Sequence, residues 1–305
     1  MTNVDDLATL LAAARDGALL HARADLGAFP VTGGDRLAWL NGLVTQDVGK
    51  LAPGAGAYSL AVGKTGKIMA ELWVVAGSDR VLVVAERARI PLLREHFDKH
   101  LVMEDAEIGE PLERGVLVAH GASAAEVLAA ARARGGDGAL VRWTGHGDSA
   151  VIVAPDAGFV PALEGTPLTD DGWEALRIAW GVPRFGVDYD EQSLPQEASL
   201  ETVAVSFSKG CYLGQETVFM LEKRGHARKK LVRLAVDGDA ALSAGAEIAL
   251  SDGTGGIGAV TSATPAPPGA GGWLALASVK HKHTTAGTAL VVADRAARVR
   301  EADAT

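Results

Sequence analysis

Short stretches of alternating and helically spaced apolar residues divide the first half of the chain into strands and helices. Residues 1–20 carry charged side chains between apolar positions and predict an amphipathic helix. Turn residues at 63–66 (Gly-Lys-Thr-Gly) indicate a hairpin, and Asp35 and Ser123 stand where a side chain caps a helix. The pattern predicts strands at 27–31, 58–62, 68–75, 80–85, 116–119, 141–143 and 150–154, and helices at 36–44, at 88–101 and after Ser123. This order indicates α+β sheets with helices on one face.

The second half of the chain has a different texture. Residues 170–181 predict one more helix, and an irregular stretch follows from Pro183. Beyond Gly225 helical spacing is absent from the sequence, and Gly- and Pro-rich turns separate short apolar runs. These runs predict strands at 231–236, 247–250, 256–262, 273–279 and 289–292. We therefore expect a small all-β domain from about residue 228.

Composition and charge narrow the classes of function. A chain of 305 residues has room for two or three domains, and 48% apolar with 22% charged residues is ordinary for a soluble globular protein. The net charge of −9 and the pI of about 5.4 exclude a chain-wide basic surface for nucleic acid, but they allow a local patch. With no signal-peptide pattern, no run of 18 apolar residues and one cysteine, we expect a cytoplasmic protein without a membrane partner.

The single cysteine, Cys211, lies in the run 209–216 (Lys-Gly-Cys-Tyr-Leu-Gly-Gln-Glu). A lone thiol cannot form an internal disulfide, so it is either a small buried hydrophobe or a thiol kept for its chemistry. Its neighbours favour the second interpretation. Gly210 and Gly214 allow a turn and a close approach to a ligand, and Lys209 supplies a charge that lowers a thiol pKa.

The cysteine motif belongs to a longer pattern. Upstream of it lie 173–178 (Trp-Glu-Ala-Leu-Arg-Ile), 181–188 (Gly-Val-Pro-Arg-Phe-Gly-Val-Asp) and 195–197 (Pro-Gln-Glu). Further pieces are Asp35-Arg36, 40–48 (Leu-Asn-Gly-Leu-Val-Thr-Gln-Asp-Val), 63–67 (Gly-Lys-Thr-Gly-Lys), Arg224-Gly225-His226 and 256–262. Over nearly the whole chain, these pieces resemble the YgfZ branch of the folate-binding family that is related to the glycine-cleavage T protein.

This resemblance implies two α/β modules, one of them ferredoxin-like, around a central channel in residues 1–226, and a β-barrel in residues 227–305. It implies a reduced folate, tetrahydrofolate or a relative, in the channel. It also implies a role in assembly or maintenance of iron–sulfur proteins, including tRNA-modifying methylthiotransferases. Proteins of this branch are not glycine-cleavage enzymes.

Two sets of candidate site residues follow from the resemblance. The first surrounds the essential thiol and consists of Cys211, Lys209, Tyr212, Gln215 and Glu216. The second, expected near the folate, consists of Arg177, Trp180, Arg184, Asp188 and Glu197. Trp180 would stack on the flat ring and Arg184 would pair with the anionic tail. The alternative is that Trp180 belongs to the core and Arg184 to the surface.

The chain departs from the T-protein pattern at three positions. The carboxylate pair that serves aminomethyl transfer is replaced by Ala70-Glu71, which removes half of the pair. Ala179 replaces a glutamate that can bind the pterin ring, and Met220 replaces an arginine after the cysteine motif. These changes argue against aminomethyltransferase activity and weaken the inference of folate binding.

The remaining chemistry-bearing residues leave several interpretations open. Covalent catalysis by Cys211 needs a nearby base, for which Glu216 or His226 is the candidate, whereas one thiol suits a transient cluster contact or a redox role better. The pairs His281/His283, expected on one strand face, and His96/His100, on one helix face, are too few for a metal site and suggest surface histidines. Residues 63–67 lack the spacing of a phosphate-binding loop.

The basic run at 223–233 is either a solvated linker or an anion site for a folate polyglutamate or RNA phosphate. Its lack of interleaved aromatics leaves direct nucleic-acid binding unsupported.

We thus expect a folate-binding accessory protein for iron–sulfur proteins or their assembly factors, one without turnover of its own. The rival in the enzyme class is a folate-dependent one-carbon transferase or demethylase, and the loss of a carboxylate at position 70 disfavours it. A third reading is a folate carrier or RNA-binding module in which Cys211 is dispensable.

Overall fold

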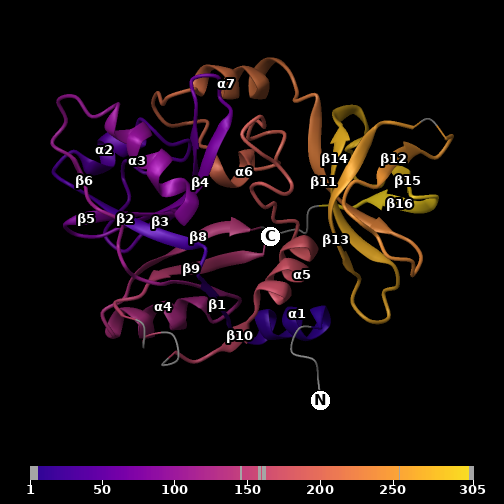
Figure 1. Cartoon of the computed structure of the whole chain (residues 1–305), viewed down its shortest axis with the longest axis horizontal. Helices are drawn as coiled ribbons and strands as arrows, with labels where there is room; N and C mark the ends of the chain where they lie inside the picture. The colour runs from indigo at the N-terminus through magenta and orange to yellow at the C-terminus, as the bar shows by residue number, and fades with distance from the viewer. Residues whose placement is uncertain (1–5, 145, 157–158, 160–162, 254, 302–305) are drawn as a thin grey trace.

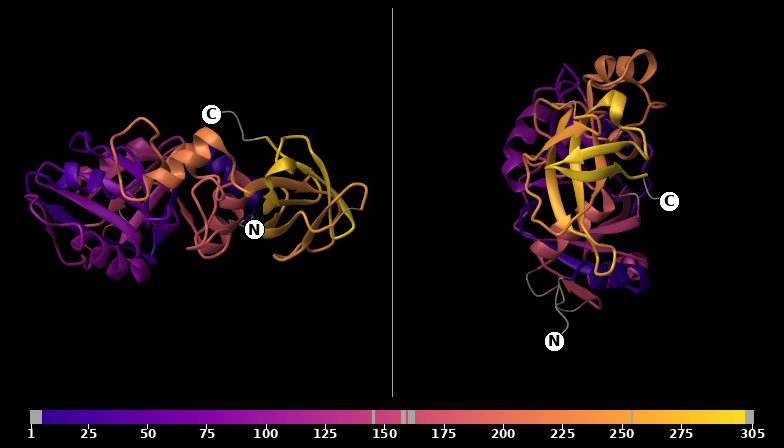
Figure 2. Two further views of the ribbon diagram at one scale, coloured as in Figure 1. Left: turned by 90° about the horizontal axis from the view of Figure 1, so that it is seen from above. Right: turned by 90° about the vertical axis from the view of Figure 1, so that its right-hand side faces the viewer.

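The computed structural model describes residues 6–144, 146–156, 159, 163–253 and 255–301. Figure 1 shows two sheets with their helices on one side and a small barrel on the other, with helix α5 (Asp170–Trp180) between them. Seen from above, the molecule is elongated and the barrel forms one end (Figure 2). Within the described part of the chain, no helix combines the length and apolar character needed to cross a membrane.

The first sheet is antiparallel and has the strand order β3-β4-β5-β2-β6. Its strands are β2 (Leu26–Thr32), β3 (Gly56–Val62), β4 (Ile68–Ala76), β5 (Arg80–Glu86) and β6 (Glu107–Ile108). Helices α2 (Arg36–Asn41) and α3 (Ile90–Asp98) cover one face. Strand β5 alternates accordingly, because Val81 and Val83 pack beneath these helices while Leu82 and Val84 face the centre of the molecule.

The second sheet has the order β10-β1-β7-β9-β8, with β1 parallel to β10 and the other pairs antiparallel. Its strands are β1 (Leu19–Arg23), β7 (Val116–His120), β8 (Asp137–Thr144), β9 (Gly147–Val153) and β10 (Thr166–Leu168). Helix α4 (Ala124–Ala133) covers the outer face, where Val127 and Ala131 pack with Leu117 and Ile152. The chain enters this sheet at β1, builds the whole first sheet and then returns, so the two modules are intertwined.

A central core joins the two modules. It combines inward-facing residues of both sheets with α1 (Leu7–Asp16) and α5, and it holds a group of large rings: Tyr58, Trp73, Trp143, Trp173 and Trp180. Trp73 and Trp143 meet edge to face with ring centroids 5.2 Å apart.

The last 70 or so residues described form a closed barrel of order β11-β14-β13-β12-β15-β16. Its strands are β11 (Lys229–Val236), β12 (Glu247–Leu250), β13 (Gly258–Pro265), β14 (Trp273–Lys280), β15 (Ala289–Val292) and β16 (Arg295–Val299). Leu231 and Leu276 pack against Ile178 of α5 and so attach the barrel to the body. The mixed α/β architecture with a C-terminal β-barrel is as predicted.

Several predicted boundaries were wrong. The expected helix over residues 1–20 is α1, which ends at Asp16, and Leu19, Leu20 and His21 instead form a strand between β7 and β10; residues 1–5 lie outside the described part. Helices α2 and α3 end earlier than predicted, at Asn41 and Asp98.

Three predictions of local detail were also wrong. Asp35 and Ser123 occupy N-cap positions, but neither side chain makes the capping bond, since Asp35 accepts from the backbone N–H of Asp105 instead. Helix α7 (Gln215–Arg224) and strand β16 were missed altogether. His281 and His283 lie on a short 3₁₀ turn, His281–His283, rather than on a strand.

Candidate functional site

Cys211 is exposed on the loop that joins α6 (Glu201–Ala204) to α7. We call residues 206–214 the thiol loop. Two backbone bonds hold it to the segment after α2, because Ser206 N–H donates to Thr45 O at 3.0 Å and Leu213 N–H donates to Gly42 O at 3.0 Å. The loop is therefore fixed on both sides of the thiol.

Lys209 fastens the same two segments together. Its ammonium donates to three backbone carbonyl oxygens, at 2.5 Å to Asn41, 2.8 Å to Val44 and 2.9 Å to Gln46. The three N–H groups of the ammonium are thus matched by three carbonyl acceptors. Burial lowers the pKa of Lys209 to about 8, which leaves the ammonium mostly protonated at neutral pH. From the sequence, Lys209 was predicted to lower the pKa of the thiol, and this stays a prediction. The structure shows that Lys209 holds the thiol loop to the segment after α2.

The residues after Cys211 differ in exposure. Tyr212 is buried, burial raises its pKa to about 12, and its hydroxyl has no hydrogen-bond partner among the described residues. Lys209 Nζ lies 5.1 Å from the centre of its ring. Gln215 is half-buried and Glu216 is exposed in the first turn of α7.

Gly214 sets the direction in which the chain leaves the loop. It adopts φ +78°, and a Cβ there would lie 2.3 Å from the carbonyl oxygen of Gly63. The N-terminus of α7 is therefore seated against the β3–β4 turn, which only glycine permits. His226, one of the predicted bases, follows the far end of α7 and lies against His281 with ring centroids 4.5 Å apart. A ten-residue helix of about 15 Å thus separates it from the thiol loop.

A cavity of about 260 Å³, the central hollow, lies between the first sheet, β1 and α5. Its lining is mostly charged: His21, Arg23, Asp25, Glu71, Glu86, Asp170, Glu174, Arg177 and Arg184 with Trp143, Trp173 and three small or apolar residues. Arg23 forms a bidentate pair with Asp25 at 2.8 and 2.6 Å. The hollow therefore offers both signs of charge beside two indole rings.

Glu71 is the buried carboxyl of this hollow. One of its oxygens accepts hydrogen bonds from the hydroxyls of Tyr58 and Tyr189, each at 2.8 Å. Burial raises the pKa of Glu71 and raises those of both tyrosines well above their usual value. Ala70 faces the opposite way, into the core under α2 and α3. Sequence reasoning missed the tyrosines, because Tyr189 is 118 residues from Glu71 and no local pattern marks the pair.

Arg177 and Asp188 form a buried ion pair at 2.8 Å, with side chains 1% and 0% exposed. Asp188 also accepts from Thr261 and Ser262 of β13, at 2.5 and 2.7 Å, and from the backbone N–H of Arg184 at 2.9 Å. Arg177 donates to Glu174, Ser262 and Val182 O as well. Asp188 thus carries four protein hydrogen bonds, and the pair joins α5 to the barrel.

The other three residues expected near the folate occupy different surroundings. Trp180 is buried and stacks on His146, with ring centroids 5.2 Å apart and planes 18° apart. Arg184 is exposed, lines the central hollow and donates to Glu174 at 3.2 Å. Glu197 accepts from the backbone N–H of Leu194 at 3.1 Å in the loop before α6. The structure therefore brings Arg177, Arg184 and Asp188 together and leaves Trp180 and Glu197 apart from them.

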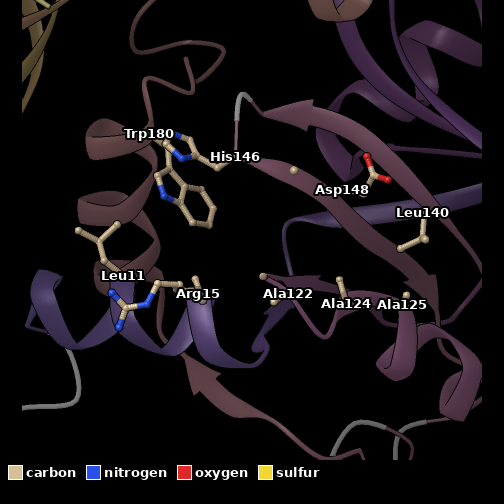
Figure 3. Close-up of a pocket in the computed structure, with 12 residues that line it drawn as sticks. Leu11, Arg15, Ala122, Ala124, Ala125, Leu140, His146, Asp148 and Trp180 are labelled. Atoms are coloured by element: carbon tan, nitrogen blue, oxygen red, sulfur yellow. The ribbon is translucent and has the colours of Figure 1, made fainter. Parts of the chain in front are cut away.

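Trp180 lines three further cavities, two of which concern the candidate site. One of about 320 Å³, the interdomain hollow, lies between the body and the barrel and includes Lys230, Arg233 and Arg300 in its lining. It shares Trp143, Val182 and Pro183 with the central hollow. The other, of about 530 Å³, is lined mainly by small residues, and Figure 3 shows His146 and Trp180 side by side above Leu11 and Arg15 of α1.

Two buried histidines beside the central hollow were also missed. His21 Nε2 donates to Asp170 at 2.9 Å, and His120 stacks on Trp173 with ring centroids 4.6 Å apart. Burial lowers the pKa of both, in His120 well below its usual value, so His120 is neutral at physiological pH. Among the residues described, no group of three or more His, Cys, Asp or Glu side chains is arranged to hold a metal ion.

Comparison with known proteins agrees with this architecture. The GCVT N-terminal domain family matches residues 7–137. The tRNA-modifying protein YgfZ of Vibrio vulnificus is 28% identical over 223 residues, which are 69% of this chain and 68% of the relative. The Escherichia coli protein of the same name is 27% identical over 240 residues, 73% of either chain.

The aminomethyltransferases are similar as well. The enzyme of Rubrobacter xylanophilus is 26% identical over 285 residues, 84% of this chain and 74% of the relative. The crystal structure of aminomethyltransferase T from Bartonella henselae covers 95% of this chain and 87% of its own, with a TM-score of 0.78 and 20% identity, so it shows the shared fold.

The fold is that of aminomethyltransferase T, and the GCVT N-terminal domain family matches the part of the chain that holds the first sheet. Over about 70% of its length the chain is similar to the YgfZ proteins, as expected from the sequence.

Proposed function

We propose that this chain is a folate-binding accessory protein of tRNA modification that supports iron–sulfur enzymes through the thiol of Cys211. The observation that carries the proposal is an exposed thiol on a loop fastened by Lys209 and Gly214. A rigidly presented thiol is suited to meeting a partner protein. The similarity to proteins named for tRNA modification supports the choice of pathway.

The chemistry assigned to Cys211 is transient ligation. The thiol would lose its proton as its sulfur binds an iron of the partner's cluster, and it would regain a proton when a ligand of the partner takes its place. No electron is transferred in this exchange. One thiol fits this role because a resident cluster needs about four ligands. The role requires a reducing compartment, so we assign the protein to the cytoplasm.

The folate part of the proposal concerns the two adjoining hollows. Volumes of about 260 and 320 Å³ are close to the lower end of the roughly 300–1,000 Å³ typical of ligand pockets. Glu71 would bind the polar edge of the folate ring, and the indole of Trp143 would stack on the face of that ring. The anionic tail would lie toward Arg233 and Arg300, and Arg184 would stand at the opposite rim. The buried indole N–H of Trp143 has no hydrogen-bond partner in the part of the chain that the structure describes, and a ring nitrogen or carbonyl of the ligand could accept from it.

The test is complementation of a bacterial strain that lacks its own homologue. We expect wild type to restore the methylthio content of tRNA, measured by mass spectrometry of nucleosides, and Cys211→Ala to lose most of that effect. Ser208→Ala, on the same exposed loop, is the matched control and should behave as wild type. Full activity of Cys211→Ala would refute the thiol role. Absence of tetrahydrofolate binding at high micromolar concentration would refute the folate role and leave the thiol role intact.

A second candidate is a folate-dependent one-carbon transferase, and Glu71 favours it. A buried carboxyl with a raised pKa, held by two tyrosines in a cavity, can exchange a proton with a bound substrate. The loss of its partner carboxylate at Ala70 counts against this candidate. Turnover of an aminomethyl or methyl donor by the purified protein with tetrahydrofolate would favour the enzyme over the accessory factor.

A further inference from the structure

Two basic segments far apart in the sequence meet where α7 leads into the barrel. Pairing of β11 with β14 brings residues 226–228 beside the end of β14 and the 3₁₀ turn after it, and His281 N–H donates to Arg228 O at 3.0 Å. They enclose a cavity of about 730 Å³, which we call the barrel pocket. Its lining consists of His226, Ala227, Arg228, Lys280, His281, Lys282, Thr284 and Thr285.

The barrel pocket concentrates positive charge without an internal counter-charge. No carboxylate lines it, and Arg228, Lys280 and Lys282 form no ion pair among the described residues. Lys229 stands directly opposite Lys280 in the β11–β14 ladder. Like charges at such positions destabilise a sheet. In a chain of net charge −9, an anion bound in the pocket would offset this repulsion.

Three further cations of the 223–233 run contact other groups. Lys230 pairs with Glu201 at 2.6 Å, Lys223 lies 5.3 Å from the centre of the Phe219 ring, and Arg233 lines the interdomain hollow. From this run, Arg228 and His226 line the barrel pocket, and Lys229 pairs in register with the lining residue Lys280.

We propose that the barrel pocket binds the phosphate backbone of an RNA. Its cations come from the linker, β14 and the turn after it, so they can meet successive phosphates rather than one ion. Arg228 can hold a phosphate through two N–H groups, and the lysines act as point charges. Since no Phe, Tyr or Trp lines the pocket, it would grip the backbone without stacking on bases.

Helix α7 relates this pocket to the thiol loop. The loop precedes its N-terminus and the pocket follows its C-terminus, about 15 Å away along the axis. The inference goes beyond the proposed function, because it requires neither a folate nor a cluster.

The test measures binding of a fluorescently labelled, unmodified tRNA transcript by anisotropy, from 50 to 300 mM NaCl. The variant Lys280→Gln/Lys282→Gln should bind about ten-fold or more weakly at 100 mM salt. Its slope of log K against log salt should be smaller by about 1.5, because each lost phosphate contact removes about 0.7–0.9. The matched control is Lys50→Gln/Arg134→Gln, two exposed cations outside the barrel that should bind as wild type. Equal melting temperatures verify that all variants fold.

Three results would overturn the inference. One is equal tRNA binding by wild type and the barrel-pocket variant, or no binding by wild type at 50 mM NaCl. Another is displacement of the tRNA by millimolar inorganic phosphate that exceeds the displacement by chloride at equal ionic strength, which would indicate a simple anion site. The third is loss of affinity for a folate pentaglutamate, but not for tRNA, in the barrel-pocket variant, which would assign the pocket to a folate tail.

Discussion

At the scale of single residues, the proton on Glu71 has a measurable consequence. Burial raises the pKa of this carboxyl in the folded protein above its ordinary value of 4.5. The folded state then holds the proton more tightly than the unfolded chain does. The contribution of Glu71 to stability is greatest below pH 4.5 and is lost as the pH rises through the folded pKa.

We therefore predict that Glu71→Gln changes the pH dependence of stability. The amide can still accept from Tyr58 and Tyr189 and cannot ionise, so the melting temperature of the variant relative to wild type should rise between pH 4.5 and pH 8. Calorimetry at half-unit intervals of pH measures the difference. Glu113→Gln, at an exposed carboxylate, controls for the loss of one negative charge. A difference that stays flat or falls with pH would show that Glu71 is ionised in the fold.

The sequence marked some of these residues and could not mark others. Cys211 and Lys209 stand in one short motif, so reading along the chain finds them. The three carbonyl partners of Lys209 lie more than 160 residues earlier, and the fastening role is visible only once the thiol loop is folded onto them. Tyr58, Tyr189 and His120 carry no local signal, since an isolated aromatic or histidine is ordinary core material.

At the scale of elements, the glycines of the cysteine motif have different roles. Gly214 has positive φ and backbone packed 2.3 Å from where its Cβ would be, whereas Gly210 has neither constraint and nothing within 4 Å. We predict that Gly214→Ala lowers the free energy of unfolding by about 1–3 kcal/mol, and by more if the β3–β4 turn cannot shift. Gly210→Ala, its matched control, should leave stability unchanged. Urea denaturation compares them, and equal stabilities would contradict the seating of α7 on the turn.

Gly210→Ala also tests why the motif contains this glycine. Because the fold does not require it, a loss of complementation by Gly210→Ala at full stability would point to close approach of a partner beside Cys211.

The elements that sequence reasoning identified are those whose burial follows a simple period. Strands β3, β4, β5, β7 and β9 were found because apolar runs between turn residues mark buried strands. Helix α7 was missed since its four apolar residues, 218–221, are consecutive and mark no single face, and its start is set by Gly214 packing on a distant turn. Strand β1 was absorbed into the first helix, because Leu19 and Leu20 continue an apolar spacing that pairing with β7 and β10 overrides.

At the scale of the whole molecule, one buried network ties the body to the barrel. Arg177 on α5 and Asp188 on the following loop meet Thr261 and Ser262 of β13, which are more than 70 residues away. Arg177 and Asp188 were expected near a folate. A sequence does not reveal that these two charged side chains bind each other within the fold. The central hollow and the interdomain hollow share the lining residues Trp143, Val182 and Pro183, which lie near this network. The network therefore also helps to fix the shape of the interdomain hollow between the body and the barrel.

The network predicts a large effect from a small chemical change. Asp188→Asn keeps the shape of the side chain but removes the fully buried carboxylate that faces the guanidinium of Arg177, so that the partly exposed Glu174 is the only counter-charge left to it among the described residues. We expect the free energy of unfolding to fall by about 3–5 kcal/mol. Arg177→Met should be similarly destabilising. The double variant should be less destabilised than the sum of the two, because no unpaired charge is left in the interior. Glu110→Gln breaks the exposed pair with Arg94 and should leave the denaturation midpoint nearly unchanged.

Limited proteolysis should cut Asp188→Asn faster than wild type in the segment between α7 and β11, since the barrel is held less firmly against α5. Additive effects of the two substitutions would mean that Arg177 and Asp188 act separately, and the barrel would then be held by its other contacts, such as those of Ile178 with Leu231 and Leu276.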